Sequence, residues 1–410
     1  MSLPATAWCV RADHAGSAET GNGPEGVPSM TVLPSRRALP PAPTSVSPSP
    51  ISVATASTAG PDTVGFRSSG QSPGELPVSP NPRTRTVHLI GPGQVGRAFL
   101  RRASALPVSV VAISDSTATV FDRAGLDVEA VLAHKAKAPL AWWPRAETIP
   151  TELAIAVVGA DIVVDATPTD AAGTPAAVER GRAALRCGAF LCLCAKNALA
   201  ASPGWLLGSF RGRVGIDAVL GGTGQKLVSE LDELRQHCRS LSLVGNVTTT
   251  VIIQAIERGA SVQAGIEEAR ARGLLEADPT RDFDGSDAAT KLVAVWGAVF
   301  GDGGRPPAEE TVRREDVRDL DAKVVQARAR RGATTRLVAR GGRNGDDLRV
   351  RFEELPAGSP LAAPPDRVVY GYELAQGLRV HTGLAVGHER TAEALVQDVV
   401  TALGGKVVCP

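Results

Sequence analysis

The sequence lacks the features that would place it at once among nucleic-acid-binding, membrane or secreted proteins. It has almost no excess charge, because 44 Lys and Arg stand against 43 Asp and Glu and the formal net charge is +1. This balance gives no general attraction to nucleic acid or to an anionic membrane surface. No apolar run reaches the ~20 residues of a membrane-spanning helix, and the N-terminus has no continuous apolar core of the signal-peptide kind. We therefore expect no nucleic-acid and no membrane partner.

Metal-binding cysteine patterns are also missing. The chain has six cysteines, but no two form a Cys-x-x-Cys pair and no histidine lies at metal-ligand spacing from them. Cys192 and Cys194 lie in an apolar segment, where cysteine acts as a small buried hydrophobic residue. Scattered thiols of this kind are typical of a reducing compartment and predict a cytoplasmic protein.

Residues 1–84 differ in kind from the rest of the chain. They contain 14 of the 30 prolines, many serines and threonines, and no lysine. Such a stretch cannot bury enough apolar surface to offset the entropy of ordering, so we predict a disordered tail. Arginine and serine are also typical of a transit peptide, but Asp13, Glu19 and Glu25 count against one. Met30 is a second candidate start.

A dinucleotide-binding fingerprint opens the ordered part. The apolar segment 86–90 runs into Gly-Pro-Gly-Gln-Val-Gly, and a helical pattern follows. In such a loop the first glycine permits the tight turn, the second lets a pyrophosphate approach the backbone, and the third lets helix and strand pack closely. The alternative is a glycine-rich turn in some other α/β unit. The loop residues that we assign to a cofactor are Gly91, Gly93, Gln94, Val95 and Gly96.

An acidic residue stands where such folds bind the ribose. The second apolar segment ends at Asp115, 24 residues after Gly91, which is close to the expected spacing. No basic residue directly follows Asp115, and this favours NAD over NADP. Two later apolar segments end near Thr167 and at Lys196, and the carboxyl ends of parallel strands meet at the ligand crevice. We predict a Rossmann-type domain over 85–217 that binds NAD or NADP.

The second half of the chain has a different pattern. One pair of alternating apolar segments flanks the turn-rich GGRNGDD, and another flanks LAQ, so each pair predicts a β-hairpin. The β-branched run 241–259 is compatible with a strand or with a buried helix. Antiparallel strands after a parallel unit predict an α+β domain at 218–383. The fold class is therefore α/β, a doubly wound parallel sheet with an α+β second domain, and the closing helix at 384–405 is expected to pack back on the first.

Carboxylates gather around one lysine between Gly273 and Leu292. Ser286 is a suitable helix N-cap and Asp287 falls in the first turn. Asp287 and Lys291 are four residues apart and share one helix face. One interpretation is a solvated ion pair worth about 0.3–0.5 kcal/mol. The other is an acid/base lysine oriented by a carboxylate.

Together these patterns resemble the homoserine dehydrogenase family over residues 86–403. That family shares the dinucleotide fingerprint, a lysine after a strand, a glycine turn, an N-G-T-T segment, a closing G-x-G-A-G…TA and the motif G-Y-x-E-x-D-P-x-x-D-x-x-G-x-D-x-x-x-K. Here the long motif reads Gly273-Leu-Leu-Glu276-Ala-Asp278-Pro279-Thr-Arg-Asp282-Phe-Asp-Gly285-Ser-Asp287-Ala-Ala-Thr-Lys291. The resemblance implies reversible, NAD(P)H-dependent reduction of L-aspartate 4-semialdehyde to L-homoserine, in threonine and methionine biosynthesis, by a homodimer.

The resemblance also implies individual site residues. The substrate-binding residues it implies are Glu276, Asp282, Thr248 and Gly222. The catalytic residues it implies are Lys196, Lys291 and Asp287. Gly387, in the closing segment, is implied near the nicotinamide. The ligands it implies for Na+ or K+ are Asp217, Leu220, Gly222 and Gly224. A lysine that acts as acid or base near neutral pH needs a pKa lowered from ~10.4 by burial or by the other lysine.

Four residues depart from the family pattern. Leu274 replaces the tyrosine of the long motif, and Ala195 replaces the asparagine before the lysine. Gln225 replaces the proline of the glycine turn, and Ala385 replaces a glycine of the closing segment. They leave the reaction class unchanged and bear on substrate identity. Two alternatives therefore stay open: a dehydrogenase of a related amino-acid aldehyde, which Leu274 favours, and a non-catalytic NAD(P)-binding relative. We expect the stand-alone form, without a kinase domain or a C-terminal regulatory domain.

Overall fold

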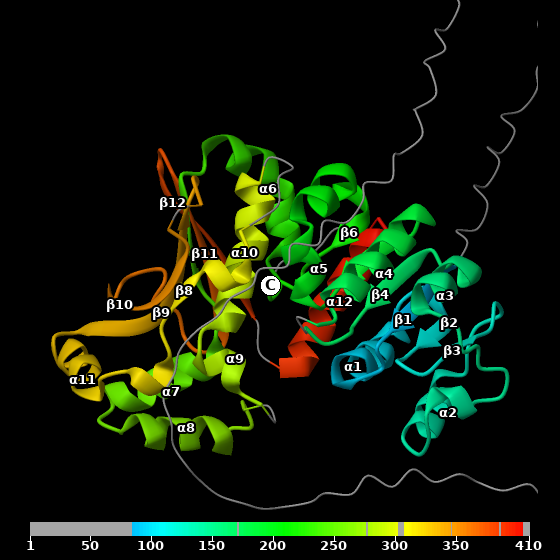
Figure 1. Cartoon of the computed structure of the whole chain (residues 1–410), viewed down its shortest axis with the longest axis horizontal. Helices are drawn as coiled ribbons and strands as arrows, with labels where there is room; N and C mark the ends of the chain where they lie inside the picture. Colours follow the sequence, from blue (N-terminus) through cyan, green and yellow to red (C-terminus); the bar gives the residue numbers. More distant parts are fainter. Residues whose placement is uncertain are drawn as a thin grey trace, which may run out of the picture. The chain divides into compact units, whose positions relative to one another are not determined.

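Two six-stranded sheets form the framework of the protein (Figure 1). The computed structural model describes residues 84–169, 172–275, 278–301, 307–345, 347–384 and 387–404. These described residues belong to one compact unit. The predicted tail lies outside the described residues, apart from Thr84. No helix among the described residues is long and apolar enough to cross a membrane.

The first sheet is parallel except for one edge strand. Its strands are β1 (Arg85–Ile90), β2 (Val108–Ser114), β3 (Thr119–Phe121), β4 (Ile162–Asp165), β5 (Phe190–Leu193) and β6 (Val214–Gly215). They lie in the order β3-β2-β1-β4-β5-β6, and only β3 is antiparallel to its neighbour. The strands read as continuous apolar runs because helices bury both faces of a doubly wound sheet. The strand order reverses between β1 and β4, which is where such a sheet leaves a ligand crevice. The predicted α/β fold class is confirmed.

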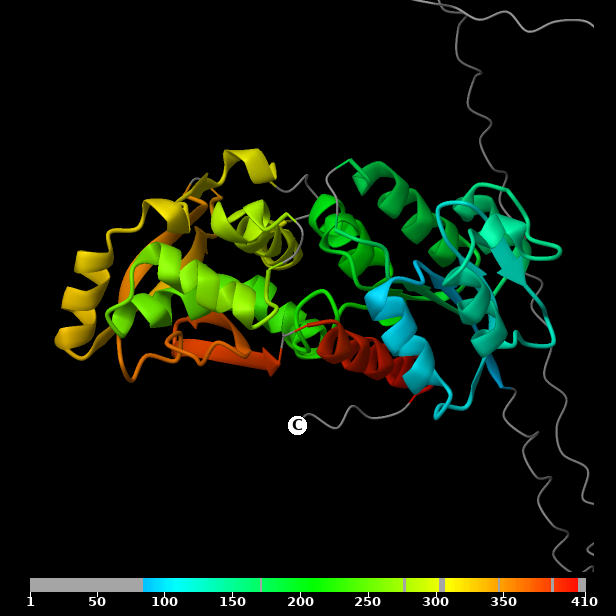
Figure 2. The ribbon, with the colours of Figure 1, turned by 90° about the horizontal axis from the view of Figure 1, so that it is seen from below.

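Helices from both ends of the chain cover this sheet. They are α1 (Gln94–Ala103), α2 (Val128–Lys135), α3 (Thr151–Val158), α4 (Thr174–Arg186), α5 (Lys196–Ala201) and α12 (Gly387–Ala402). The closing helix α12 lies beside α1 (Figure 2). Ala392, Leu395 and Val399 of α12 are buried in the same core as β1, and Arg102 of α1 pairs with Glu389 of α12 at 2.5 Å. The residues around Gly387 are thereby brought next to the dinucleotide loop.

The second sheet is antiparallel except at one edge. Its strands are β7 (Ser240–Val244), β8 (Arg313–Arg314), β9 (Ala333–Gly342), β10 (Arg349–Pro356), β11 (Arg367–Leu374) and β12 (Gly377–Leu384). They lie in the order β12-β11-β7-β9-β10-β8, and β8 is parallel to β10. Both predicted hairpins, β9–β10 and β11–β12, are confirmed.

The helices of this half include the one that carries the long motif. They are α6 (Gly224–His237), α7 (Val247–Glu257), α8 (Val262–Ala271), α9 (Thr280–Phe283), α10 (Ser286–Phe300) and α11 (Ala322–Arg330). The β-branched run 241–259 forms both of the expected structures in turn, strand β7 and then helix α7. Its chain reverses at Gly245 and Asn246, where the Asn246 side chain caps α7 by accepting the N–H of Thr249 at 2.8 Å.

Helix α10 is almost completely buried. Of its 15 residues, 13 are buried, and Asp287 and Lys291 are the two that remain partly accessible. A helix that is apolar all round belongs to a core, so the Asp287–Lys291 pair does not lie on an ordinary solvated face. The prediction that Ser286 is the N-cap is wrong. Gly285 holds that position with φ 75°, and Asp284 accepts the N–H of Ser286 at 2.9 Å.

Candidate active site

A cavity of about 900 Å³ lies between the carboxyl ends of the first sheet and helices α7 and α10. Its size is that of a pocket for a cofactor and a small substrate. Residues of the first half that line it include Gly91, Gly93, Gln94, Val95, Thr167, Thr169 and Lys196. Residues of the second half that line it include Asn246, Thr248, Leu274, Asp282, Asp287 and Lys291. Gly387, at the start of α12, also lines it, whereas Gly96, Asp115 and Gly222 lie outside its lining.

The glycine loop between β1 and α1 fits a dinucleotide. A Cβ on Gly96 would lie 2.2 Å from the carbonyl oxygen of Gly91, so only glycine allows this approach of helix to strand. Gly91 has φ 87° and would carry a Cβ 2.9 Å from the backbone of Thr167. Beside Gly93 there is free space within 4 Å, which is the room that a pyrophosphate needs against the backbone. The α1 N-terminus then faces the phosphates with its free N–H groups.

The predicted ribose acid, Asp115, is already held by the protein. Its Oδ1 accepts the backbone N–H and the hydroxyl of Thr117, both at 2.7 Å, and its Oδ2 contacts the ammonium of Lys135 on α2. Burial opposes the charge on Asp115, but the bonds from Lys135 and Thr117 outweigh it and lower its pKa. Sequence reasoning missed Lys135, because the only cue was a lysine 20 residues further along the chain.

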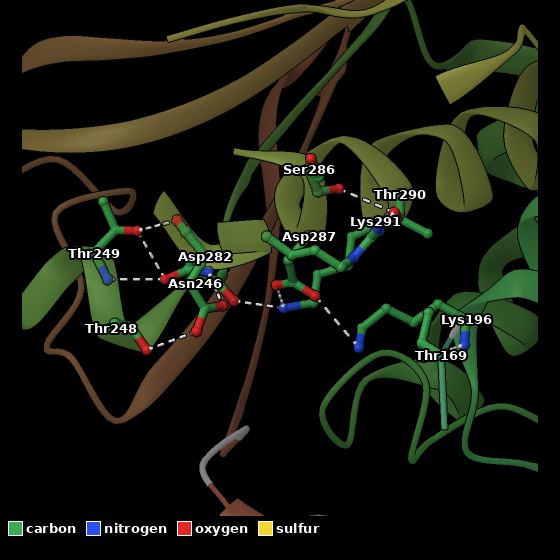
Figure 3. A network of polar contacts seen from close by, with 12 residues as sticks. Thr169, Lys196, Asn246, Thr248, Thr249, Asp282, Ser286, Asp287, Thr290 and Lys291 are labelled. Carbon is green, nitrogen blue, oxygen red and sulfur yellow. Dashed lines mark hydrogen bonds and ion pairs between the residues drawn. The ribbon is translucent and has the colours of Figure 1, made fainter. Parts of the chain in front are cut away.

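One carboxylate joins the two predicted catalytic lysines across the cavity. Asp287 Oδ2 accepts from Lys291 Nζ at 2.7 Å, and its Oδ1 lies 3.4 Å from Lys196 Nζ (Figure 3). Lys291 also donates to the carbonyl oxygen of Gly245 at 2.6 Å. Lys196 comes from the opposite half, at the first residue of α5, where its backbone N–H donates to Thr169 Oγ1 at 3.1 Å. The structure therefore brings together all three residues predicted as catalytic.

The pKa of Lys196 is raised, whereas a lysine acid or base near neutral pH needs a lowered one. Burial opposes the charge on Lys196, but the nearby Asp287 carboxylate outweighs burial, and the pKa of Lys196 is raised. Lys196 thus lacks the lowered pKa that a lysine acid or base near neutral pH needs, and spacing along the chain could not show that a carboxylate from α10 reaches it. Burial also opposes ionisation of Asp287, yet Lys291 and Lys196 hold its pKa well below the usual range. In this arrangement Lys196 is held in its protonated, cationic form.

A second carboxylate, Asp282, is oriented by the start of α7. It accepts from Asn246 Nδ2 at 2.8 Å and from Thr248 Oγ1 at 3.2 Å (Figure 3). Burial, and then the nearby charge of Asp287, raise the pKa of Asp282. Asn246 was missed by sequence reasoning, although its place before the T-T-T segment was a cue to a helix cap. Glu276, predicted to bind the substrate amino group, lies outside the described residues.

The residues predicted to hold Na+ or K+ form a tight turn before α6. Asp217 Oδ1 accepts the backbone N–H of Gln225 at 2.8 Å, and the carbonyl oxygen of Asp217 accepts the backbone N–H of Gly222 at 2.7 Å. The carbonyl oxygen of Leu220 accepts the Thr223 hydroxyl at 2.8 Å. A Cβ on Gly224 would lie 2.4 Å from the Ile216 backbone. No group of three or more His, Cys, Asp or Glu side chains among the described residues is placed to hold a metal. The cation site stays a prediction.

Known proteins resemble this chain over most of the described part. The family model for homoserine dehydrogenase matches residues 227–400, and that for glutamate/leucine/phenylalanine/valine dehydrogenase matches residues 79–176. The homoserine dehydrogenase of Corynebacterium glutamicum is 30% identical over 179 residues, 41% of this chain and 40% of that relative. The homoserine dehydrogenase of Methanocaldococcus jannaschii is 26% identical over 311 residues, 71% of this chain and 88% of the relative.

The length of these matches varies between relatives. The chain spans 40% of the Corynebacterium glutamicum protein, 52% of the one from Pyrococcus horikoshii and 38% of the one from Bacillus subtilis. Among solved structures, a hyperthermophilic archaeal homoserine dehydrogenase in complex with NADPH aligns with a TM-score of 0.61 at 23% identity, covering 78% of this chain and 97% of the other. The homoserine dehydrogenase of Thermoplasma acidophilum gives the same TM-score and identity, over 78% and 99%. The chain is thus similar to homoserine dehydrogenases, by the family model over residues 227–400 and by the Methanocaldococcus jannaschii relative over 71% of its length.

Proposed function

We propose that this protein catalyses the reversible, NAD(P)H-dependent reduction of L-aspartate 4-semialdehyde to L-homoserine. The observation that carries the proposal is the Lys196–Asp287–Lys291 array on the wall of the cavity that the dinucleotide loop also lines. A bound nicotinamide cofactor supplies the hydride. The carbonyl oxygen gains negative charge as hydride arrives, and a nearby cation and proton donor stabilise that charge.

The contacts of the two lysines suggest different roles. Lys291 is committed to two acceptors, Asp287 at 2.7 Å and the Gly245 carbonyl at 2.6 Å. Lys196 has one longer contact, 3.4 Å to Asp287, so it keeps N–H groups for a substrate oxygen. We infer that Lys196 gives the proton to the carbonyl oxygen, while Lys291 holds Asp287 in place and adds positive charge.

The amino group of the substrate is a cation and calls for an anion. Asp282 offers one at the cavity wall, and its orientation is held by Asn246 and Thr248. Asp282 and Lys196 approach the cavity from opposite halves of the chain. A substrate with an ammonium at one end and a carbonyl at the other can therefore be held between an anion and a proton donor.

We expect the purified chain to reduce NADP+ or NAD+ when L-homoserine is added, and to oxidise the reduced cofactor with L-aspartate 4-semialdehyde. The measurement is the absorbance band of reduced nicotinamide, with L-homoserine omitted as the control. A chain that binds the cofactor without any homoserine-dependent change would instead be a non-catalytic relative.

A related amino-acid aldehyde is the second candidate substrate, and Leu274 is the observation that favours it. Leu274 lines the cavity and packs against the apolar cluster of α7 and α8, in the position where the family motif has a tyrosine. An apolar side chain there offers no hydroxyl to the substrate. Comparing kcat/KM for homoserine with that for other amino alcohols separates the two candidates.

We also propose that the cofactor is NADP. An acid that reads the ribose 2′-hydroxyl of NAD acts through its negative charge, and the charge of Asp115 is balanced by Lys135 and held by Thr117. Lys135 supplies a positive charge at the same place, which suits a 2′-phosphate. The lack of a basic residue directly after Asp115, which favoured NAD, is thus offset by a lysine from α2.

Replacing Lys135 with alanine should reduce the preference for NADP over NAD by about 10-fold or more, because a charge-assisted hydrogen bond contributes about 1.5–3 kcal/mol. The measurement is the ratio of kcat/KM for the two cofactors. Lys137→Ala removes an exposed lysine two residues away and should leave the ratio unchanged. The same ratio in wild type and Lys135→Ala would rule out a role for Lys135 in cofactor choice.

The homodimer that the family resemblance implies is likewise our proposal. Its test is the mass of the purified chain in solution, measured by light scattering.

A further inference from the structure

A closed set of partly buried hydrogen bonds lies at the end of β4, next to the cavity. The side chain of Asp165, the last residue of β4, is 1% exposed, and Arg180 of α4 donates through Nε to its Oδ2 at 2.8 Å. The same guanidinium donates through Nη2 to Thr167 Oγ1 at 2.8 Å. Thr167 in turn donates its hydroxyl to Asp165 Oδ1 at 2.6 Å and its backbone N–H to the same oxygen at 3.1 Å.

This set holds the loop 166–169, which forms part of the cavity wall. The loop touches the dinucleotide loop directly, since a Cβ on Gly91 would lie 2.9 Å from the backbone of Ala166 and Thr167. Two residues further, Thr169 accepts the backbone N–H of Lys196 at 3.1 Å. A shift of this loop would therefore move both a wall of the cofactor site and the base of Lys196.

The nicotinamide end of a cofactor belongs next to this loop. By the rule for such folds, the adenosine end would lie toward β2 and the phosphates at the N-terminus of α1. The reactive ring must then reach toward Lys196, and the loop 166–169 lies between the dinucleotide loop and that lysine. The glycine loop, the N-terminus of α1 and the loop 166–169 together fit the full length of a dinucleotide.

We propose that Arg180 is a positioning residue for the nicotinamide end of the cofactor, acting through Asp165 and Thr167 on the loop 166–169. The inference rests on the proposed function, because it assumes a nicotinamide cofactor in this cavity. The Thr167 hydroxyl and backbone N–H are both bonded within this set, so Thr167 acts on the cofactor through the position of the loop that it anchors. Arginine is required, because its planar fork bonds two acceptors at once and an ammonium does not reproduce that geometry.

The test compares a complete cofactor with one that lacks only the nicotinamide. The dissociation constant is measured for NADPH or NADH, whichever binds more tightly, and for the matching ADP-ribose. In Arg180→Lys and in Thr167→Val, the complete cofactor should bind about 10-fold more weakly, as expected for the loss of charge-assisted hydrogen bonds. The ADP-ribose should bind as it does to the wild type.

Two variants make the outcome decisive. Thr167→Val keeps the Arg180–Asp165 ion pair and the size of the side chain, so it reports on the loop even if a change at Arg180 impairs folding. Arg182→Met removes a partly exposed arginine of the same helix that pairs with Glu179, and it should change neither constant. Equal weakening of both ligands in Thr167→Val, or no weakening of either, would overturn the proposal. The measurement needs no turnover, so a chain that binds the cofactor but does not oxidise homoserine fails the proposed function without failing this test.

Discussion

Replacing Lys196 with alanine should lower kcat for semialdehyde reduction by about 100-fold or more and leave the fold intact. A general acid typically contributes about 10²–10⁴-fold, and Lys196 is the lysine with N–H groups left for the substrate. The side chain makes a single 3.4 Å ion pair, and Asp287 keeps its shorter contact with Lys291 in the variant. The measurements are kcat, the melting temperature and the dissociation constant of the reduced cofactor.

Small primary amines provide a second readout for Lys196→Ala. An amine that enters the vacated space should restore part of kcat, because it replaces the missing proton donor without restoring any packing. Lys291→Ala should also lose activity, but it removes the donor to the Gly245 carbonyl and leaves Asp287 with only the longer contact to Lys196, so it should be less stable and should respond poorly to amines. Lys323→Ala, on the exposed surface of α11, is the control. A kcat close to wild type in Lys196→Ala would remove this residue from the mechanism.

The parts of the site that were predictable from the sequence depend on local geometry. The fingerprint could be recognised because each glycine has a steric reason within the loop or at its neighbours, as with Gly96 against Gly91. The Asp287–Lys291 contact was predictable because the two residues lie one helical turn apart on α10, whereas the long motif was recognised by its resemblance to one family. The hairpins followed from alternation and turn residues, which are properties of short segments.

The contacts that the sequence did not reveal join residues from different elements. Arg180 with Asp165, Lys135 with Asp115 and Asn246 with Asp282 are separated by 15, 20 and 36 residues. No periodicity links such partners, and each is a single residue among many of its type. The sign of the Lys196 pKa shift was inaccessible for the same reason, since it depends on how close a carboxylate comes to a partly buried ammonium.

Asp287→Asn should change the pH dependence of the reaction as well as its rate. In the wild type burial opposes the charge on Lys196 and Asp287 outweighs it, so the pKa of Lys196 is raised. Without this carboxylate, burial still lowers the pKa of Lys196, and the smaller effect of Asp282 opposes it. Reduction needs protonated Lys196, so its rate should begin to fall at a pH lower than in the wild type, by about one unit or more.

The oxidation of homoserine gives an independent check that the pKa of Lys196 falls in Asp287→Asn. Oxidation of homoserine needs Lys196 without its proton, so the acid limb of that profile should also move to lower pH in Asp287→Asn. At neutral pH the reduction rate should fall by about 100-fold, because the variant loses the carboxylate that orients the proton donor. Asp278→Asn changes an exposed carboxylate of the same motif and should keep both profiles. A slower enzyme with unshifted profiles would show that Asp287 orients the site but does not set the protonation of Lys196.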